Sequence, residues 1–325
     1  MTVALFTLGG TIAMAGTGSG GVVSRLTGAD LTAAAPGLAD IPLDVRDVEA
    51  VPSAALAYRQ ILDLVDAAGA AVADGAAGVV VTQGTDTLEE TAFLADLLWP
   101  HPEPLVFTGA MRNPTLAGPD GPANLLAAAR VAAASAARDL GVLVAFNDEI
   151  HAARFVRKTH STSTATFASP NAGPLGHVIE GAVRLLTRPP RHAPLPPVDR
   201  DRLAATRVAL HTVTLDDDLA LLDALAPGLD GLVVAGFGVG HVPPNFAPAL
   251  GGLAARMPVV LASRTGAGSV LQDTYGAVGS ETDLRRRGLV CGGLLDPYKA
   301  KVLLRMLLAG GADRPAVAAA FARHG

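Results

Sequence analysis

Short apolar runs alternate with longer stretches rich in alanine and leucine along most of the chain. In the first half, continuous apolar runs predict strands at 2–8, 45–51, 78–83, 104–109 and 141–146. Helical composition predicts helices between them at 56–73, 87–98 and 121–138. Apolar strands that alternate with helices are typical of a parallel sheet covered on both faces. The pattern therefore predicts an α/β domain of the doubly wound kind.

A proline-rich segment interrupts this alternation. Five prolines fall within residues 189–197, a composition that predicts a semi-rigid, extended linker. Beyond it we expect strands at 208–213, 231–236 and 258–263 and helices at 216–225 and 297–309. A chain of 325 residues also exceeds what one core usually supports. We therefore expect two doubly wound α/β domains with mainly parallel sheets, a larger one at 1–187 and a smaller one at 207–325, joined by a linker at 188–206.

Composition narrows the classes of function. The net charge is −5 and no basic stripe occurs, so no nucleic-acid partner is expected. No uninterrupted apolar run reaches 18 residues, and MTVALFTLGGTIA at the start lacks the basic region of a signal peptide. These features predict no membrane span and a cytoplasmic protein. The single cysteine, Cys291, excludes an intrachain disulfide and is expected to be a small core residue.

Candidate chemistry lies where the predicted strands end, the edge at which open α/β sheets bind ligands. The residues that follow the first four strands are Thr11, Ser53, Thr85 with Asp86, and Ala110. The histidines show no metal-ligand spacing, so no metal site is expected. GTGSGG at 16–21 fits a dinucleotide-binding fingerprint by letter, but it opens no helix. We interpret it as a glycine-rich loop.

The stretch TQGTDTLEETA at 82–92 has two interpretations from its residues alone. Thr and Asp are favoured at helix N-termini, and Thr87 with Glu90 fits a capping box, so the stretch can be an ordinary helix start. A threonine can also act in nucleophilic catalysis when a base takes its proton. The residues by themselves leave both interpretations open.

Lysine is rare in this chain, which makes each lysine informative. Only Lys158, Lys299 and Lys301 occur among 25 Lys and Arg residues. Unlike arginine, lysine can lose its proton in a suitable environment and serve as a base. Lys158 lies among hydroxyls in RKTHSTSTATF, whereas the other two lie on a predicted helix, where solvated charge is expected. Lys158 is therefore the candidate base.

Seven segments together resemble the bacterial-type L-asparaginase family of amidohydrolases. They are TLGGTIA (7–13), TQGTDTLEETA (82–92), FTGAMRNP (107–114), DGPANL (120–125), VLVAFND (142–148), KTHSTSTATFASPNAGPLG (158–176) and LLDPYKAKVLL (294–304). Their order and spacing cover nearly the whole chain. The resemblance implies hydrolysis of L-asparagine to L-aspartate and ammonia through a threonine acyl-enzyme, without a cofactor. It also implies a homotetramer built from intimate dimers, in which a neighbouring C-terminal domain completes each site.

The resemblance assigns the catalytic roles residue by residue. Thr11 matches the threonine thought to form the acyl-enzyme. Thr85, Asp86 and Lys158 match a second threonine with its aspartate and lysine. This set suits the chemistry, because a lysine can take a proton from a hydroxyl while a carboxylate orients it.

Substrate binding is assigned in the same way. Ser53 matches the serine that holds the α-carboxylate of the substrate, although its residue type after Pro52 equally fits a helix N-cap. Gly84 lies in a strand-to-helix turn whose backbone N–H groups suit a developing oxyanion. Ala110 matches the backbone position near the leaving amide.

Several positions depart from the family pattern. Gln83 replaces a histidine, and residues 14–31 contain no tyrosine to partner the first threonine. Val239 and Tyr275 stand where the neighbouring subunit often supplies an asparagine and a glutamate. Tyr275 lies in the loop QDTYGAVGSETD, whose glycines permit a close approach. We therefore expect Tyr275 to serve the neighbouring site.

Two further hypotheses remain open. One is a mixed asparaginase–glutaminase, because one methylene in a pocket is worth only about 1–3 kcal/mol. The other is a non-catalytic amino-acid sensor or the asparaginase-like subunit of an amidotransferase, and the missing loop tyrosine favours the sensor. The beginning of the first motif at residue 7 argues against the subunit.

Overall fold

The computed structural model describes residues 2–16, 23–24 and 26–325. Two compact units make up the chain, Met1–Leu195 (unit 1) and Pro196–Gly325 (unit 2). Residues 17–21 of the predicted glycine-rich loop lie outside the described residues.

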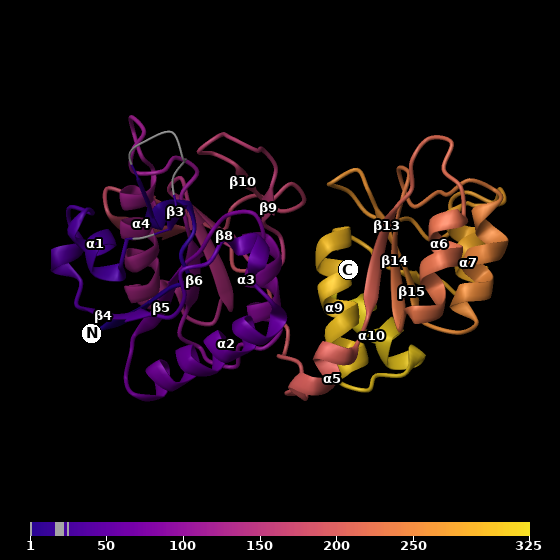
Figure 1. Cartoon of the computed structure of the whole chain (residues 1–325), viewed down its shortest axis with the longest axis horizontal. Helices are drawn as coiled ribbons and strands as arrows, with labels where there is room; N and C mark the ends of the chain where they lie inside the picture. Colours follow the sequence, from indigo (N-terminus) through magenta and orange to yellow (C-terminus); the bar gives the residue numbers. More distant parts are fainter. Residues whose placement is uncertain (1, 17–22, 25) are drawn as a thin grey trace. The chain divides into compact units, whose positions relative to one another are not determined.

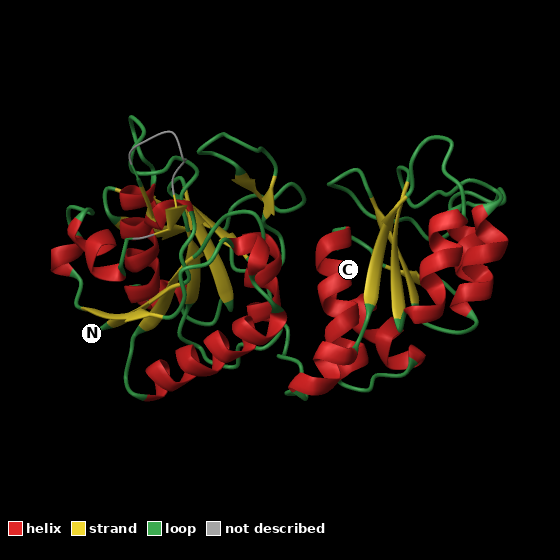
Figure 2. Ribbon diagram, viewed as in Figure 1, coloured by secondary structure: helices red, strands yellow, loops and turns green. Residues whose placement is uncertain are grey.

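An eight-stranded sheet forms the centre of unit 1 (Figure 1, Figure 2). Its order is β12-β11-β8-β7-β6-β5-β1-β4. The parallel strands are β1 (Val3–Thr7), β4 (Leu43–Asp47), β5 (Gly78–Thr82), β6 (Leu105–Thr108) and β7 (Val142–Phe146). Antiparallel strands complete one side: β8 (Glu149–Ala152), β11 (Gly176–Ile179) and β12 (Ala182–Leu185). The mainly parallel sheet confirms the predicted fold class, and the antiparallel strands are additions that the sequence pattern did not indicate.

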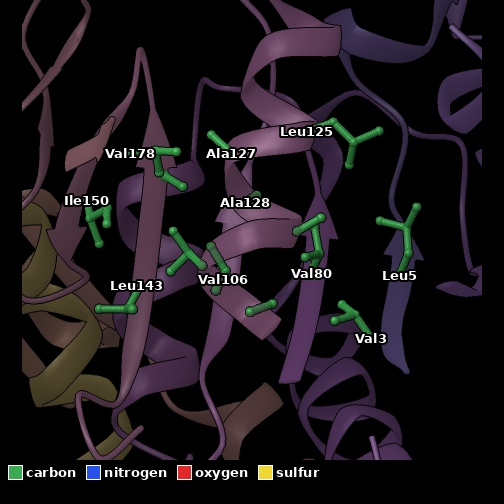
Figure 3. Packing of buried hydrophobic residues seen from close by; sticks show 14 of the residues in the cluster. Val3, Leu5, Val80, Val106, Leu125, Ala127, Ala128, Leu143, Ile150 and Val178 are labelled. Atoms are coloured by element: carbon green, nitrogen blue, oxygen red, sulfur yellow. The ribbon is translucent and has the colours of Figure 1, made fainter. Parts of the chain in front are cut away.

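Helices cover both faces of this sheet (Figure 1). α4 (Gly121–Ala133) packs over β5, β6 and β7 on one face. The opposite face carries α2 (Tyr58–Ala73) and α3 (Leu88–Asp96). Under α4, one row of paired strand positions is fully buried: Leu5, Val80, Val106 and Leu143 (Figure 3). Each such side chain contributes roughly 1.5–3 kcal/mol when it is removed from water, which holds the strand ends in register.

Shorter elements connect the layers of unit 1. They are η1 (Thr11–Ala13), β2 (Met14–Ala15), β3 (Val23–Ser24), α1 (Gly28–Ala33), η2 (Leu38–Asp40), η3 (Ser53–Ala55), η4 (Ser135–Ala137), β9 (Arg157–Lys158) and β10 (Phe167–Ala168). The helix predicted at 121–138 is wrong in its last turn: α4 ends at Ala133, because the backbone of Ala134 is extended. The strand predicted at 45–51 is observed earlier, as β4.

Unit 2 has a four-stranded parallel sheet in the order β13-β14-β15-β16. Its strands are β13 (Val208–Thr212), β14 (Gly231–Gly236), β15 (Val259–Ser263) and β16 (Val290–Cys291). Its helices are α5 (Arg200–Ala205), α6 (Ala220–Leu225), η5 (Ala226–Gly228), α7 (Phe246–Ala254), α8 (Glu281–Arg286), α9 (Pro297–Ala309) and α10 (Arg314–His324). α5 forms inside the segment predicted to be a linker. Across the described parts of both units, every helix is too short or too polar to cross a membrane.

Lys299 corrects a prediction made from its position on a helix. Its side chain is fully buried rather than solvated, because α9 packs against β13 and β14. Nζ lies 3.2 Å from Oδ2 of Asp296, whose Oδ1 accepts hydrogen bonds from the first N–H groups of the helix. Cys291 is half-buried, with Sγ near the carbonyl of Val270. Lys299 thus belongs to a buried ion pair with Asp296, which the sequence analysis did not predict.

Candidate active site

Three segments remain side by side after the strands β1, β5 and β6 end. The N–H of Leu8 donates to the carbonyl of Thr82 at 2.9 Å, and the N–H of Gln83 donates to the carbonyl of Thr108 at 2.9 Å. These bonds extend the parallel ladder by one residue beyond each strand. The sheet therefore delivers the Thr11, Thr85 and Ala110 segments to one edge.

A contact between two glycines fixes the separation of the first two segments. Gly10 has φ +90°, and a Cβ added there would lie 2.2 Å from the backbone nitrogen of Gly84. Only glycine tolerates both this conformation and this approach. The backbone that leads into Thr11 is therefore packed directly on the turn that leads into Thr85.

Thr11 begins the short helix η1, and its side chain is half-buried. Its carbonyl accepts from the N–H of Met14, so the backbone of this turn is ordered. Among the described residues, however, the Thr11 hydroxyl makes no hydrogen bond. No base is therefore hydrogen-bonded to this hydroxyl within the described residues.

Thr85 is in a different situation, because Lys158 contacts it directly. Lys158 Nζ lies 3.0 Å from Thr85 Oγ1 and 2.9 Å from Asp86 Oδ1. Thr85 is only 5% exposed, whereas the Asp86 side chain is 67% exposed. The lysine amine thus bridges a buried hydroxyl and a carboxylate that faces solvent. A neutral amine in this place can accept the hydroxyl proton, and the carboxylate orients it.

Ser53 holds the turn that carries Thr85 and Asp86. Its buried Oγ accepts from the N–H of Asp86 at 3.2 Å, and its carbonyl accepts from the Thr87 hydroxyl at 3.0 Å. The capping box predicted for Thr87 and Glu90 is therefore wrong: Thr87 is the N-cap residue of α3, but its hydroxyl is used elsewhere. Ser53 itself starts the turn η3 and caps no helix through its side chain. Its hydroxyl proton is available to a second partner, since a hydroxyl both donates and accepts.

The side chain of Gln83 also contacts the turn that carries Thr85 and Asp86 and the helix that follows it. Its side chain is fully buried, with Oε1 accepting from Thr91 Oγ1 at 2.9 Å and Nε2 lying 3.4 Å from Thr87 Oγ1. Gln83, which stands where the family pattern has a histidine, thus links the end of β5 to α3 through an uncharged side chain. It does not titrate, so it adds no charge beneath the turn.

Two residues that received no role from the sequence hold the Ala110 segment. Asp120 accepts hydrogen bonds from the N–H groups of Met111 and Arg112. Buried Asn124 donates to the carbonyl of Gly109 at 3.0 Å and accepts from the N–H of Asn147 at 2.9 Å. The motif DGPANL was the available signal, but its contacts span up to 23 positions along the chain.

The hairpin of β9 and β10, which carries Lys158, is anchored at its far end by His151 on β8. His151 Nδ1 lies 3.0 Å from Oγ of Ser169, directly after β10, and Nε2 lies 3.2 Å from Oε2 of Glu149. Burial, and to a smaller extent the charge of His177, lowers the pKa of His151 to about 4. Although a serine, a histidine and a glutamate are aligned here, His151 is fully buried and Ser169 is 5% exposed. The His151 ring is therefore uncharged near physiological pH, and it serves as a structural anchor.

Tyr275 belongs to unit 2, whereas the residues above belong to unit 1. Its ring is half exposed and packs edge-on against His241, with the ring centroids 5.0 Å apart. Fully buried Glu281 accepts from the N–H groups of Thr274 and Tyr275 at 2.9 and 2.7 Å and pairs with His241 at 3.1 Å. Burial raises the pKa of Glu281, but the hydrogen bonds from Tyr275, Thr274 and His241 together hold it below its usual value. The backbone of this glycine-containing loop is therefore anchored at Thr274 and Tyr275 by Glu281.

No cluster of three His, Cys, Asp or Glu residues with metal-binding geometry occurs within residues 2–16, 23–24 and 26–325. The groups brought together around Thr85 are hydroxyls, the amine of Lys158, the carboxylate of Asp86 and backbone groups. This is the donor set of acyl transfer by a hydroxyl nucleophile.

Comparisons with known proteins agree with this chemistry. Residues 2–191 match the family described as "Asparaginase, N-terminal", and residues 207–321 match "Glutaminase/Asparaginase C-terminal domain". The chain belongs to the asparaginase family. Among its relatives, a probable L-asparaginase of Deinococcus radiodurans is 38% identical over 247 residues, 75% of this chain and 74% of that protein. An L-asparaginase of Bacillus licheniformis is 33% identical over 317 residues, 94% of this chain and 95% of the relative.

A solved structure extends the likeness of this asparaginase-family chain to three dimensions. The crystal structure of a probable cytoplasmic L-asparaginase from Campylobacter jejuni matches with a TM-score of 0.86 at 31% identity, over 99% of both chains. The resemblance inferred from the motifs is thereby confirmed. Within unit 1, the residues predicted for the site lie at one sheet edge, whereas the role of each remains a prediction.

Proposed function

We propose that this member of the asparaginase family hydrolyses the side-chain amide of L-asparagine to L-aspartate and ammonia through a threonine acyl-enzyme. The observation that carries the proposal is the position of Lys158 Nζ, within hydrogen-bond distance of both Thr85 Oγ1 and Asp86 Oδ1. That set is a proton relay at the end of a strand, in a family described by its action on asparagine and glutamine.

In the first step of the proposed reaction, Thr11 Oγ attacks the amide carbon of the substrate, and the hydroxyl proton is transferred to the amide nitrogen. The C–N bond then breaks, the nitrogen leaves as ammonia after taking up this proton, and an ester to Thr11 remains. In the second step a water molecule attacks the ester, which releases aspartate and restores the threonine. Thr85 passes the proton of the attacking water to Lys158, the lysine returns a proton to the departing Thr11 oxygen, and Asp86 keeps the amine in place.

Backbone and hydroxyl groups around the relay would bind the substrate. We assign the α-carboxylate to the hydroxyl of Ser53, whose proton is still available after its oxygen accepts from Asp86. Asp86 is exposed on the same turn and suits the α-ammonium. N–H groups of the Gly84 turn suit the developing oxyanion, and Ala110 lies near the leaving amide.

Assembly and location complete the proposal. We infer a homotetramer built from intimate dimers, with the C-terminal unit of a neighbouring subunit completing each site. We also infer a cytoplasmic location, as in the name of the Campylobacter jejuni relative. A site assembled from two chains is lost on dissociation, so a fully active monomeric fraction at high dilution would contradict this assembly.

The test is ammonia release by the purified protein from L-asparagine, L-glutamine and their D-isomers, with Lys158→Met as the matched control. We expect release from L-asparagine that disappears in the control. Comparable rates on both L-amides would support a mixed asparaginase–glutaminase, which the name of the C-terminal family allows. Binding of L-asparagine without any ammonia release would overturn the enzymatic proposal and favour a sensor.

A further inference from the structure

Glu89 is a buried carboxylate beside the proposed relay, and the mechanism above gives it no task. It lies in the first turn of α3 and is 6% exposed. Its Oε2 accepts a hydrogen bond from the backbone N–H of Lys158 at 3.1 Å and lies 3.8 Å from Nε of Arg157. Burying a carboxylate is costly unless charged or polar donors surround it. The N–H of Lys158 and the guanidinium of Arg157 therefore offset the cost of burying the Glu89 carboxylate.

The strand that carries Lys158 needs such a support. β9 consists of two residues, Arg157 and Lys158, and it pairs only with the equally short β10, through Phe167 and Ala168, among the described residues. A two-stranded ribbon of this length is not stable by itself. The contact from α3 attaches β9 to the helix, whereas the Ser169 anchor holds the chain directly after β10.

Glu89 also belongs to the segment that carries the partners of the lysine amine. Thr85 and Asp86 contact Nζ, and three residues after Asp86 the Glu89 carboxylate contacts the main-chain nitrogen of the same lysine. One rigid turn and the helix that follows it thus hold Lys158 at both ends of the residue. The distance between Nζ and the Thr85 hydroxyl follows from this double attachment.

We propose that Glu89 is a positioning residue that sets the reach of Lys158 toward Thr85 through the main chain of β9. This inference rests on the proposed role of Lys158 as the base. Misplacement of a reacting group by about 1 Å can cost on the order of 100-fold in rate. A shorter carboxylate at position 89 therefore lowers turnover although the charge in the first turn of α3 is kept.

The test compares Glu89→Asp with Glu89→Gln. Aspartate keeps the charge but is one methylene too short to reach the Lys158 nitrogen. Glutamine keeps the reach and an acceptor oxygen but loses the charge that faces Arg157. We expect Glu89→Asp to lower kcat by roughly 10- to 100-fold with KM within about twofold, and Glu89→Gln to keep kcat within about threefold while lowering the unfolding midpoint.

Glu90→Gln is the matched control, because it removes a charge from the same helical turn at a residue that is only half-buried. It should leave kcat within about twofold, which separates positioning from a general effect on the helix dipole. Hydrogen exchange of the 153–168 segment should accelerate in Glu89→Asp and not in Glu90→Gln.

An unchanged kcat in folded Glu89→Asp would overturn the inference, as would a loss of turnover that follows the charge, with Glu89→Gln worse than Glu89→Asp. Lys158→Met distinguishes the two levels. If that variant stays active, the proposed role of the lysine fails. If it is inactive while Glu89→Asp has normal turnover, the positioning role alone fails.

Discussion

The two threonine segments of unit 1 lie against each other, yet their side chains are held in opposite ways. Thr85 is buried and hydrogen-bonded to Lys158, and the turn around it is tied to Ser53 and supported by Gln83. Thr11 is half-buried, and its hydroxyl has no hydrogen bond within the described residues. The glycine contact between the segments fixes their backbones and adds no hydrogen bond to the Thr11 side chain.

This difference separates two requirements of acyl transfer. A proton relay works when its members keep fixed distances, and the Thr85 segment provides them. A nucleophile must first receive the substrate and later carry it as an ester, so it needs room and an activating partner that arrives with the complete site. We therefore interpret Thr85 as the preorganised threonine and Thr11 as the one that becomes active only in the complete assembly.

The largest expected effect comes from removing the contact between Thr85 and Lys158. Lys158→Met removes the amine, and Thr85→Val removes the hydroxyl with little change in shape. Each should lower kcat by at least about 1,000-fold, or roughly 4 kcal/mol of barrier, because the relay loses its base or its first carrier. Steady-state ammonia release measures the loss.

Thr87→Val controls for a threonine in the same turn whose hydroxyl contacts Ser53 rather than Lys158. It should keep activity within about threefold and lose at most about 1–2 kcal/mol of unfolding free energy through the missing hydrogen bond. Activity within about tenfold of wild type in either relay variant (about 1.4 kcal/mol) would be incompatible with the assignment.

The second prediction concerns which threonine carries the acyl group. An intermediate trapped by rapid acid quenching should map to Thr11 by mass spectrometry, and Thr11→Val should form none and lose at least about 100-fold in kcat. An adduct on Thr85 would exchange the roles of the two residues. It would also show that the buried, hydrogen-bonded hydroxyl is the one that attacks.

Much of the scaffold behind this comparison could be predicted from local sequence. The strands at β1 and β5 are continuous apolar runs, and α9 has the predicted limits 297–309 because its N-cap and its end are local signals. The convergence of Thr11, Thr85 and Ala110 followed from the rule for strand ends. Motif spacing then indicated the family that the comparisons confirm.

The contacts that decide the remaining features span long distances along the chain. Thr87 was expected to cap its own helix, but its hydroxyl bonds a carbonyl 34 positions earlier. Glu89 lies in the first turn of α3, yet it bonds a nitrogen 69 positions later. Lys299 is buried by packing of α9 against strands that precede it by more than 60 residues. Such contacts leave no local pattern, so no local rule could find them.

A third prediction tests the anchor of the Lys158 hairpin through pH. The pKa of His151 is about 4 in the folded chain, below its ordinary value of 6.5. Between these values the unfolded chain binds the proton and the folded chain does not, so unfolding becomes easier as pH falls from 6.5 toward 4. His151 should account for a loss of about 3 kcal/mol of unfolding free energy over this window, and for no further loss below it.

Urea unfolding at several pH values in this window measures the slope. His151→Gln should flatten it, although the variant is less stable at pH 7. His177→Gln should flatten it slightly, because the smaller of the two causes of the shift is removed. Identical slopes in wild type and His151→Gln would assign the acid sensitivity to other groups.

A fourth prediction compares the Thr85 hydroxyl, which is hydrogen-bonded to Lys158, with the Thr11 hydroxyl, which has no hydrogen bond within the described residues. Serine keeps the hydroxyl but loses the methyl group that restricts the χ1 rotamer. At position 85 the lysine still orients the hydroxyl, so Thr85→Ser should lose less than about threefold in kcat. At position 11 the methyl is the main restraint, so Thr11→Ser should lose about tenfold. Equal losses in the two variants would argue that Thr11 is as well oriented as Thr85.

The smallest expected effect concerns the partner that Thr11 lacks. We propose that Tyr275 of a neighbouring subunit supplies a phenol to the site, as a donor to the nucleophile or an acceptor for the substrate ammonium. Tyr275→Phe keeps the ring and its edge-on packing on His241, and the contacts of Glu281 are to main-chain nitrogens that the change does not touch. The variant should therefore lose about three- to tenfold in kcat/KM for asparagine without a change in unfolding free energy.

Tyr298→Phe, at another partly exposed tyrosine of unit 2, controls for the loss of a phenol elsewhere. Wild-type kinetics in Tyr275→Phe would reduce this residue to a packing role, and the activating group of Thr11 would then have to come from the substrate, from water or from the segment after η1.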